Sequence, residues 1–443
     1  MKNIIVAGGG HGGIAAGMLL AEKGFDVTVY EQKSEGTLGY DWTDIFAPSA
    51  LSAIGLPLPP VTQFEYKENM TFYGPSGSGG LRQDIPPEKL EIKMERRDIY
   101  KYLITNAEER GVKFVYDCPV LSPITAGDRV IGIKTGQGDV YGDLVIDACG
   151  LNSPLRQGLP ESFGVPAEVG KNNRFYVYRA FYNKGSDEPV KDKYKVILFG
   201  EGILGVAWVA TEENYTDLLV GRFEPFDLAE AERAADYYRQ ENPSLGTELV
   251  RGGQFVEIPV RWPLAKLVAN GYAAIGDAAY MTVPIIGSGI ANSLKAARML
   301  ADTVLADADG AYSAATLWGY QRNYYQKLGN GFALLACVKE ALTVFTPADL
   351  DYLFDHGVIN ARDMSIDADT TDIFSVMKKN TARDMQAKLS GVIKDPVLLK
   401  KMLRVGGKIT ALSAVLGMQP TFYNKATVDL WVRMYERAIA AGI

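Results

Sequence analysis

The chain has 443 residues, 47% of them hydrophobic and 22% charged, which is typical of a soluble globular protein of about three structural units. Its net charge of −7 leaves no basic excess to neutralise phosphates, so a nucleic-acid binder is not expected. Two histidines and three cysteines exclude a His-rich metal site and a disulfide framework, so we expect no metal and a cytoplasmic location.

The first predicted elements are a strand at residues 3–8, a helix at residues 14–24 and a second strand at residues 25–31. A glycine-rich turn, GGGHGG, links the first strand to the helix, and the second strand ends on the acid Glu31. This order of strand, glycine turn, helix, strand and acid predicts a dinucleotide-binding site.

Each glycine of the G-x-G-x-x-G pattern has a physical task. Gly8 would allow the tight turn, Gly10 would let the backbone approach a pyrophosphate at the helix N-terminus, and Gly13 would let the helix pack closely on the strand. Glu31 would hydrogen-bond the adenosine ribose. His11 lies within the turn and is also readily explained as a polar residue at the helix start. The other predicted nucleotide contacts, besides His11, are Gly12, Gln32 and Lys33.

The fingerprint does not by itself separate NAD from FAD, but three later motifs bear on the choice. Arg96 opens a helix-like stretch, RRDIYKYLITNAEERG. Residues 143–156, DLVIDACGLNSPLR, contain the pattern G-x-x-S-x-x-R. Residues 272–294, YAAIGDAAYMTVPIIGSGIANSL, predict a strand, a Gly-Asp pair, a proline and a Gly-x-Gly turn that opens a helix.

In this order the motifs resemble those of the FAD-dependent oxidoreductases of the p-hydroxybenzoate hydroxylase superfamily, in particular its geranylgeranyl reductase and FixC-like branch. The resemblance covers residues 1 to about 305 and implies FAD as the cofactor. It implies that Asp277 accepts a hydrogen bond from the ribityl chain, that Arg96 holds the phosphates or the flavin end, and that Val120 offers backbone contacts to the adenine. The other residues implied to contact the cofactor are Gly150, Gly276, Pro284, Gly287, Ser288, Gly289 and Ile290.

The chain departs from the family pattern in two places. Hydroxylases of the superfamily usually carry Asp-Gly where this chain has Cys149-Gly150, and that aspartate is associated with the use of pyridine nucleotides. Some reductases of the branch carry a cysteine soon after the ribose acid, whereas residues 36–46, GTLGYDWTDIF, contain none. A cysteine-assisted mechanism therefore does not transfer. The candidates for proton transfer are Tyr40, Asp41, Asp44 and Tyr280, each of which also suits a structural hydrogen bond.

The four motifs must meet around one FAD, so the predicted fold is a mixed α/β architecture with interleaved domains. A Rossmann-like FAD-binding domain would comprise residues 1–60, 96–165 and 263–305. An antiparallel β-sheet substrate domain would comprise residues 61–95 and 166–262. Its aromatic residues suit either a substrate pocket or ordinary sheet packing: Phe175, Tyr176, Tyr178, Phe181, Tyr182 and Trp208.

Residues 306–443 are predicted to be helical throughout. Within residues 388–408 there are six basic residues, one aspartate and several large apolar residues. A basic amphipathic helix of this kind suits peripheral contact with the inner face of a membrane, and equally the solvated face of a helical cap or a homodimer interface.

We expect a flavin-dependent reductase or dehydrogenase that transfers a hydride between flavin N5 and an apolar or conjugated, lipid-like or aromatic substrate. The electron donor, NAD(P)H or a ferredoxin-type protein, stays open. One alternative is a monooxygenase that depends on NAD(P)H and O2. Another, of a different class, is an electron-transfer flavoprotein that passes electrons to a quinone or a protein partner.

Overall fold

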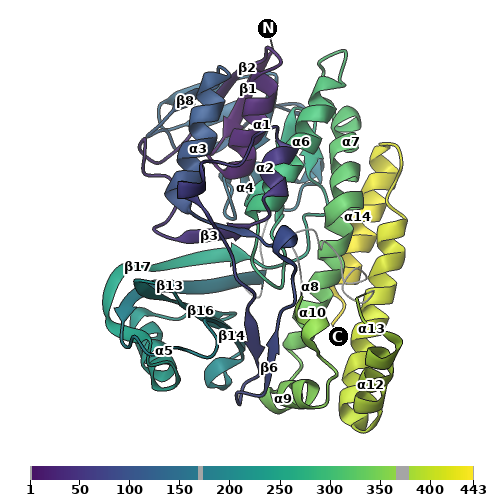
Figure 1. Cartoon of the computed structure of the whole chain (residues 1–443). Helices are drawn as coiled ribbons and strands as arrows, with labels where there is room; N and C mark the ends of the chain where they lie inside the picture. The colour runs from purple at the N-terminus through teal and green to yellow at the C-terminus, as the bar shows by residue number, and fades with distance from the viewer. Residues whose placement is uncertain (1, 168–172, 366–378, 443) are drawn as a thin grey trace.

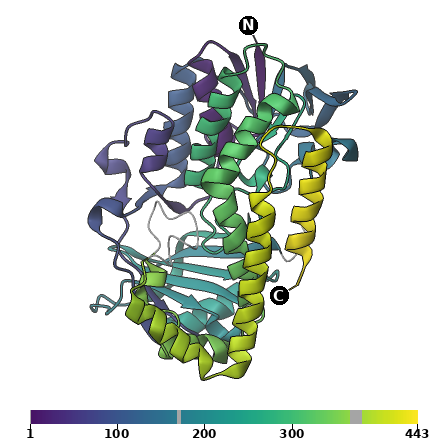
Figure 2. The same cartoon turned by 90° about the vertical axis from the view of Figure 1, so that its right-hand side faces the viewer.

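The computed structural model describes residues 2–167, 173–365 and 379–442. An upper layer that contains the N-terminus stands above a large, mostly antiparallel sheet, and long helices from the C-terminal part run along one side of both (Figures 1 and 2). The upper layer and the large sheet meet where the predicted FAD motifs converge.

The upper layer contains a six-stranded sheet in the order β18-β19-β12-β1-β2-β8. Its strands are β1 (Asn3–Ala7), β2 (Asp26–Tyr30), β8 (Lys113–Val115), β12 (Leu144–Asp147), β18 (Val268–Ala269) and β19 (Tyr272–Ala274). Every pairing is parallel except that of β18 with β19. Residues 4–7 of β1 are fully buried, as expected for a central parallel strand covered on both faces.

Three helices pack together over this sheet: α1 (His11–Ala21), α3 (Arg96–Glu109) and α6 (Ile290–Leu305), with α1 between the other two. A three-stranded sheet of β9 (Val120–Ala126), β10 (Arg129–Thr135) and β11 (Gly138–Tyr141) lies against β12, and the short helix α4 (Pro154–Gly158) packs on β9. The Rossmann-like prediction for this part of the chain is confirmed.

Helix α1 begins at His11, three residues before the predicted start, and ends at Ala21. It starts early because Gly10 is the residue that caps the helix, so that Gly12 and Gly13 belong to the first turn. Gly13 has the predicted packing role: a Cβ atom there would lie 2.5 Å from the Cβ of Ala148 and 2.9 Å from Cγ1 of Val6.

Gly13→Ala is therefore expected to lower the free energy of unfolding by about 1–3 kcal/mol, because the added methyl group has no room between helix and strand. Chemical denaturation followed by circular dichroism measures the change. Gly406→Ala is the matched control, since it places the same methyl group in a helix with no atom within 4 Å, and is expected to stabilise by about 0.5–1 kcal/mol. Equal effects of the two variants would contradict the packing argument.

The lower layer is a seven-stranded sheet in the order β17-β13-β16-β15-β14-β5-β6. Its strands are β5 (Thr71–Tyr73), β6 (Gly79–Arg82), β13 (Arg174–Lys184), β14 (Tyr194–Leu198), β15 (Gly205–Thr211), β16 (Tyr215–Arg222) and β17 (Leu245–Pro259). β17 begins at Leu245 and continues through a register shift opposite Arg179 and Ala180. The positive φ angles of Gly252 and Gly253 accommodate this irregularity.

Helix α5 (Leu228–Glu241) covers one face of this sheet and begins with a capping box of Asp227 and Glu230. Alternation along the strands divides the predicted aromatic residues between the two faces. Tyr178 and Tyr182 pack in the cluster that includes Ala231 and Ala235 of α5. Phe175, Phe181 and Trp208 belong to the cluster on the opposite face, together with Trp42.

A small sheet of β3 (Thr43–Phe46), β7 (Ile92–Glu95) and β4 (Glu65–Tyr66) connects the two layers, and α2 (Ser49–Ala53) follows β3. The strands of the six-stranded sheet come from the three segments predicted for the FAD domain, and those of the seven-stranded sheet from the two predicted for the substrate domain. The division into domains itself stays a prediction.

The described C-terminal residues are helical, as predicted. They form α7 (Ala314–Tyr324), a π-helical turn (Tyr325–Gly329), α8 (Asn330–Leu342), α9 (Pro347–Asp355), α10 (Ala361–Met364), α12 (Ala382–Ile393), α13 (Pro396–Gly417) and α14 (Lys425–Ala440). The single basic helix expected within residues 388–408 is wrong, because Asp395 caps a new helix whose first residue is Pro396.

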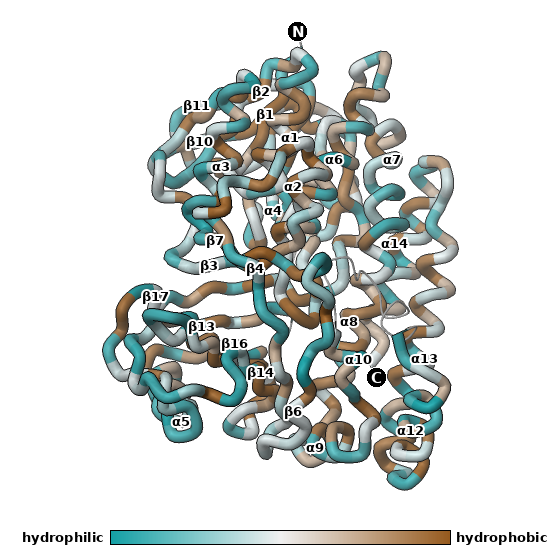
Figure 3. Tube along the Cα trace, viewed as in Figure 1, coloured by the Kyte–Doolittle hydropathy of each residue, from teal (hydrophilic) through white to brown (hydrophobic). Residues whose placement is uncertain are grey.

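Helices α7, α8 and α14 and the later part of α13 share one hydrophobic core with the six-stranded sheet, which includes the aromatic side chains of Trp318, Tyr325, Trp431 and Tyr435. Hydrophobic residues, brown in Figure 3, concentrate on β1, α1 and α6 inside the upper layer. Over the described ranges, no single helix has both the length and the apolar character to cross a membrane. One pair of helical segments, Ala314–Leu342 and Pro347–Asp355, has together the length and composition of a membrane span, but the two segments meet at an angle of 113°.

Candidate functional site

A groove of about 1180 Å³ lies at the carboxyl ends of the central parallel strands. Its walls include residues that directly follow β1, β2, β12 and β19, together with the start of α6 and part of β17. Ligands of open α/β sheets bind at this edge.

Most of the predicted cofactor residues line this groove: Gly8, Gly10, His11, Gly12, Gly13, Glu31, Gln32, Lys33, Arg96, Gly150, Gly276, Asp277, Gly287, Gly289 and Ile290. They come from segments up to about 280 residues apart in the sequence, so the structure brings the four motifs together. The part each plays in holding a cofactor stays a prediction.

Two helix N-termini open into the groove. α1 is capped by Gly10 and α6 by Gly289, and neither glycine has a side chain to satisfy the first backbone N–H groups. Gly8, with a φ of +88°, makes the turn into α1. A helix N-terminus carries a partial positive charge, so these two ends suit the pyrophosphate of a dinucleotide and the negative charge of a reduced flavin.

Glu31 occupies the end of the groove beside the glycine turn. The residue is 8% exposed; Oε2 accepts a hydrogen bond from the N–H of Gly9 at 2.6 Å, and Oε1 accepts one from the N–H of Lys33 at 2.8 Å. The carboxylate therefore fixes both the glycine turn and the loop after β2. This second role adds to the predicted contact with a ribose.

Glu31→Ala is expected to weaken FAD binding about 10- to 100-fold, because it removes a charged acceptor that is worth about 1.5–3 kcal/mol per hydrogen bond. Quenching of flavin fluorescence on titration of the apoprotein measures the dissociation constant. Glu241→Ala removes a carboxylate at the distant end of α5 and serves as the control. An unchanged affinity in Glu31→Ala would exclude the assigned role.

Asp277 lies in the middle of the groove, within the turn that follows β19. The hydroxyl of Thr282 donates a hydrogen bond to Oδ1 of Asp277 at 2.8 Å, and burial raises the pKa of the carboxyl group. Within the described part of the chain, Oδ2 of Asp277 accepts no hydrogen bond. This oxygen is therefore able to accept one from a hydroxyl group of a ligand.

Arg96 and Asp44 form a bidentate ion pair beside the groove. Nε of Arg96 is 2.5 Å from Oδ2 of Asp44, and Nη2 is 2.7 Å from Oδ1. The guanidinium group also lies 4.7 Å from the centre of the Tyr40 ring, which itself lines the groove. Arg96 thus reaches the groove as predicted, whereas Asp44 serves to orient Arg96 and does not line the groove.

His11 lines the groove and stacks on Tyr100, with 4.2 Å between the ring centres. Its Nε2 atom is buried and has no hydrogen-bond partner in the described part of the chain. Burial, and then the charge of Arg96, lowers the pKa of His11 from 6.5 to about 3, so the imidazole is neutral at pH 7. An unpartnered buried nitrogen in the wall fits a site built around a polar ligand.

The Cε1 proton of His11 is therefore expected not to titrate between pH 8 and pH 5 in proton NMR spectra of the folded protein. Because the pKa in the folded state lies below the unfolded value, the stability contributed by neutral His11 is complete above about pH 6.5 and is lost as the pH falls toward 3. His11→Gln assigns the resonance, since His356 is the other histidine. Titration of the His11 signal near pH 6.5 would contradict its burial.

Three predicted cofactor residues do not line the groove, and their contact with the cofactor stays a prediction. Val120 is the first residue of β9, an edge strand that pairs with β10 through Thr135. Pro284 is buried, and Ser288 uses its carbonyl oxygen to accept a hydrogen bond from the N–H of Val283 at 2.9 Å. These last two residues shape the turn that presents Gly287 and Gly289.

Two further proton-relay candidates also lie outside the groove wall. Asp41 is exposed and bound to Arg251 at 3.0 Å and to the N–H of Gly252 at 3.2 Å. Tyr280 is fully buried, with the guanidinium groups of Arg156 and Arg261 4.7 Å and 4.4 Å from its ring centre. Of the four candidates, Tyr40 alone is part of the wall.

The structure adds groove residues that the sequence reasoning did not identify. Trp42 contributes a buried indole, and Val256 and Ile258 from β17 contribute apolar side chains. Cys149 also lines the groove; burial raises the pKa of its thiol well above the usual value, and Sγ donates to the carbonyl of Ala7. The thiol is therefore protonated and a poor nucleophile at neutral pH.

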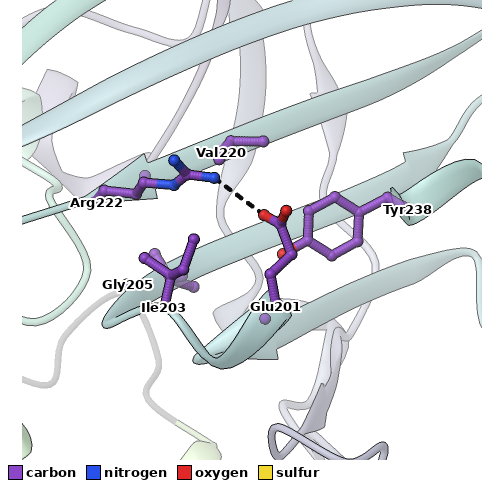
Figure 4. Close-up of a pocket in the computed structure, with 9 residues that line it drawn as sticks. Glu201, Ile203, Gly205, Val220, Arg222 and Tyr238 are labelled. Atoms are coloured by element: carbon purple, nitrogen blue, oxygen red, sulfur yellow. Dashed lines mark hydrogen bonds and ion pairs between the residues drawn. The ribbon is translucent and has the colours of Figure 1, made fainter. Parts of the chain in front are cut away.

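A second pocket, of about 190 Å³, lies on the seven-stranded sheet far from these motifs. Figure 4 shows the carboxylate of Glu201 directed toward Arg222, with the ring of Tyr238 beside it; the ion pair measures 3.1 Å. These side chains satisfy one another, and the space is smaller than a typical ligand pocket. Across the described ranges, no cluster of His, Cys, Asp or Glu has the arrangement of a metal site.

No protein-family model matches the chain, but several known proteins are similar to it. A digeranylgeranylglycerophospholipid reductase from Methanothrix thermoacetophila is 26% identical over 79% of this chain and 90% of its own length. The probable electron transfer flavoprotein-quinone oxidoreductase YdiS of Escherichia coli is 24% identical over 73% of this chain and 81% of its own length.

Among solved structures, a geranylgeranyl bacteriochlorophyll reductase-like protein from Thermoplasma acidophilum matches with a TM-score of 0.73 and 19% identity, over 91% of this chain and 99% of that one. PqsL, a probable FAD-dependent monooxygenase from Pseudomonas aeruginosa, matches with a TM-score of 0.59 and 19% identity, over 80% of this chain and 99% of that one. Motifs, groove and similar proteins together identify the chain as an FAD-dependent oxidoreductase.

Proposed function

We propose that the protein reduces carbon–carbon double bonds of an isoprenoid lipid, with FAD bound in the groove. The observation that carries this proposal is the apolar character of the groove where it meets the seven-stranded sheet: Trp42, Val256 and Ile258 lie in the same wall as the glycine-capped start of α6. An apolar wall beside an anion-stabilising helix end suits an apolar substrate next to a reduced flavin.

The names of similar proteins agree with this class of substrate. Digeranylgeranylglycerophospholipid reductases from Methanothrix thermoacetophila, Sulfolobus acidocaldarius and Haloferax volcanii share 22–26% identity with the chain over about three quarters of its length or more. The matched region comprises at least 82% of the length of each of these relatives. The lipid substrate is accordingly proposed to be a polyprenyl chain with several isolated double bonds.

FAD supplies two-electron chemistry, in which its reduced form gives up a hydride. The protein residues would bind and orient the reactants and provide the proton. Glu31 would hold the adenosine end, the N-termini of α1 and α6 the charged parts, and Asp277 a ribityl hydroxyl group. Reduction of one double bond consumes one hydride and one proton, and we propose Tyr40 as the proton donor because it lies in the groove wall.

The direct test is product analysis under argon. The purified protein, reduced with dithionite, is mixed with a geranylgeranyl glycerophospholipid dispersed in detergent, and the product is examined by mass spectrometry. We expect two hydrogen atoms to be added for each double bond reduced. An oxygenated product that forms only in air would support the monooxygenase alternative, and reoxidation by a quinone with the lipid unchanged would support the electron-transfer alternative.

A further inference from the structure

The helices α12 and α13 carry an exposed surface that combines large apolar and basic side chains. Around the break between the two helices, four apolar residues are each more than half exposed: Leu389, Ile393, Val397 and Leu403. Three exposed basic residues lie among them: Lys394, Lys400 and Arg404. We call these seven residues the α12–α13 surface. It lies at the lower end of the molecule, away from the glycine turn (Figures 1 and 2), and shows brown and teal segments side by side (Figure 3).

The inward side of the same helices is fully engaged in packing. Val392 and Leu398 are buried in a cluster with Phe199, Leu350 and Leu353. The outward apolar side chains therefore do not complete this core. Exposed groups of large apolar side chains of this kind mark interaction sites more often than ordinary surface.

The basic side chains of these helices are also divided between an inward and an outward side. Lys388, Lys401 and Lys408 turn inward and form ion pairs with Asp363, Asp349 and Glu340. By contrast, Lys394, Lys400 and Arg404 form no ion pair with any other residue in the described ranges, although the protein as a whole is acidic. The nearest acid in sequence, Asp395, uses its carboxylate to cap α13.

We propose that the α12–α13 surface docks the protein on an anionic phospholipid bilayer. Leucine, isoleucine and valine side chains would enter the boundary between headgroups and acyl chains, while the three basic groups would bind lipid phosphates. A second copy of the chain fits less well as the occupant, because a symmetric contact would place these unpaired positive charges against one another. Charge complementarity therefore selects the membrane.

This docking deepens the proposed function, and in that respect rests on it, because a polyprenyl lipid resides in a membrane. The binding test needs no activity, however, so the two proposals fail separately. Absence of vesicle binding by the wild-type protein, with intact reduction of detergent-dispersed lipid, would refute the docking alone.

The test is flotation of the full-length, FAD-loaded protein with vesicles of phosphatidylcholine, with or without a minority of phosphatidylglycerol. We expect binding to the anionic vesicles and little binding to the neutral ones. The triple charge reversal Lys394→Glu, Lys400→Glu and Arg404→Glu is expected to lower the partition coefficient at least about a hundredfold, since each basic group near an anionic surface contributes about a fivefold factor.

A matched control reverses three exposed basic residues elsewhere, Lys23→Glu, Lys101→Glu and Lys134→Glu, and is expected to bind like the wild type. A second variant, Leu389→Ser with Val397→Ser and Leu403→Ser, keeps the charges and is also expected to bind weakly. Flavin content and circular dichroism verify that each variant is folded. Three results would overturn the proposal. The two charge-reversal variants could bind equally, the wild type could fail to bind, or the wild type could form a dimer that only substitutions in the α12–α13 surface dissociate.

Discussion

Asp217→Ala is expected to lower the free energy of unfolding by about 3–5 kcal/mol, the largest stability effect of any single substitution considered. Asp217 pairs with Arg179 through two hydrogen bonds of 2.9 Å and 2.6 Å, and the two side chains are 7% and 4% exposed. Removal of the carboxylate leaves a guanidinium group charged, buried and without its counter-ion. Urea denaturation followed by tryptophan fluorescence reports the change, because Arg179 lies 4.8 Å from the Trp208 ring centre.

The same ion pair connects the large sheet to the groove. Arg179 donates to the carbonyl oxygen and the hydroxyl group of Thr43, the residue after Trp42 in the groove wall. Arg179→Met combined with Asp217→Leu should restore most of the stability, since apolar replacement of a whole buried pair is often neutral. Asp26→Ala, which breaks the exposed pair with Lys113, should cost less than about 1 kcal/mol. Equal losses in the single and the double variant would contradict the ion-pair argument.

Tyr40→Phe is expected to slow lipid reduction about 100-fold or more, the usual contribution of a general acid, if Tyr40 supplies the proton as proposed. Burial raises the pKa of Tyr40, so its hydroxyl group carries a proton throughout the neutral range. Steady-state kinetics under argon measure the turnover, and flavin titration shows whether cofactor affinity stays within about threefold.

Tyr66→Phe provides the control for Tyr40→Phe, because Tyr66 is exposed on β4 and belongs to no part of the groove wall. A general acid also shifts the pH dependence of turnover, whereas loss of a merely structural hydroxyl group does not. Unchanged turnover in Tyr40→Phe would assign the proton to water or to another group of the groove.

The sequence predicts the nucleotide half of the groove well, for a physical reason. The glycine turn, Glu31 and Asp277 each follow a strand of one parallel sheet, and the carboxyl ends of neighbouring parallel strands meet at one edge. Local motifs therefore report on a shared location. The close packing of helix and strand at Gly13 likewise follows from the motif.

The half of the groove that is proposed to hold the substrate could be predicted less well from the sequence, because its residues carry no local signal. Val256 and Ile258 belong to a strand whose alternation is typical of any half-buried sheet, and the path of Trp42 depends on Thr43 and the distant Arg179. The position of Asp41 outside the groove wall could not be predicted for a related reason. Its partner, Arg251, lies 210 residues away, and such a long-range ion pair leaves no pattern in the sequence.

The break between α12 and α13 shows a different limit. Apolar and basic periodicity over residues 388–408 favours one helix, yet Asp395 and Pro396 together form a start signal for a new one. The cap decides the outcome. The carboxylate of Asp395 accepts hydrogen bonds from the N–H groups of Val397 and Leu398, and this satisfies the first backbone donors of a new helix.

The measurement that tests the central claim most directly is a single turnover followed by flavin absorbance. Photoreduced protein is mixed under argon with a geranylgeranyl glycerophospholipid, and in a parallel run with its fully saturated counterpart. We expect the absorbance of oxidised FAD to return with the unsaturated lipid and not with the saturated one. A flavin that stays reduced with both lipids under argon, and reoxidises only when air is admitted, would contradict it.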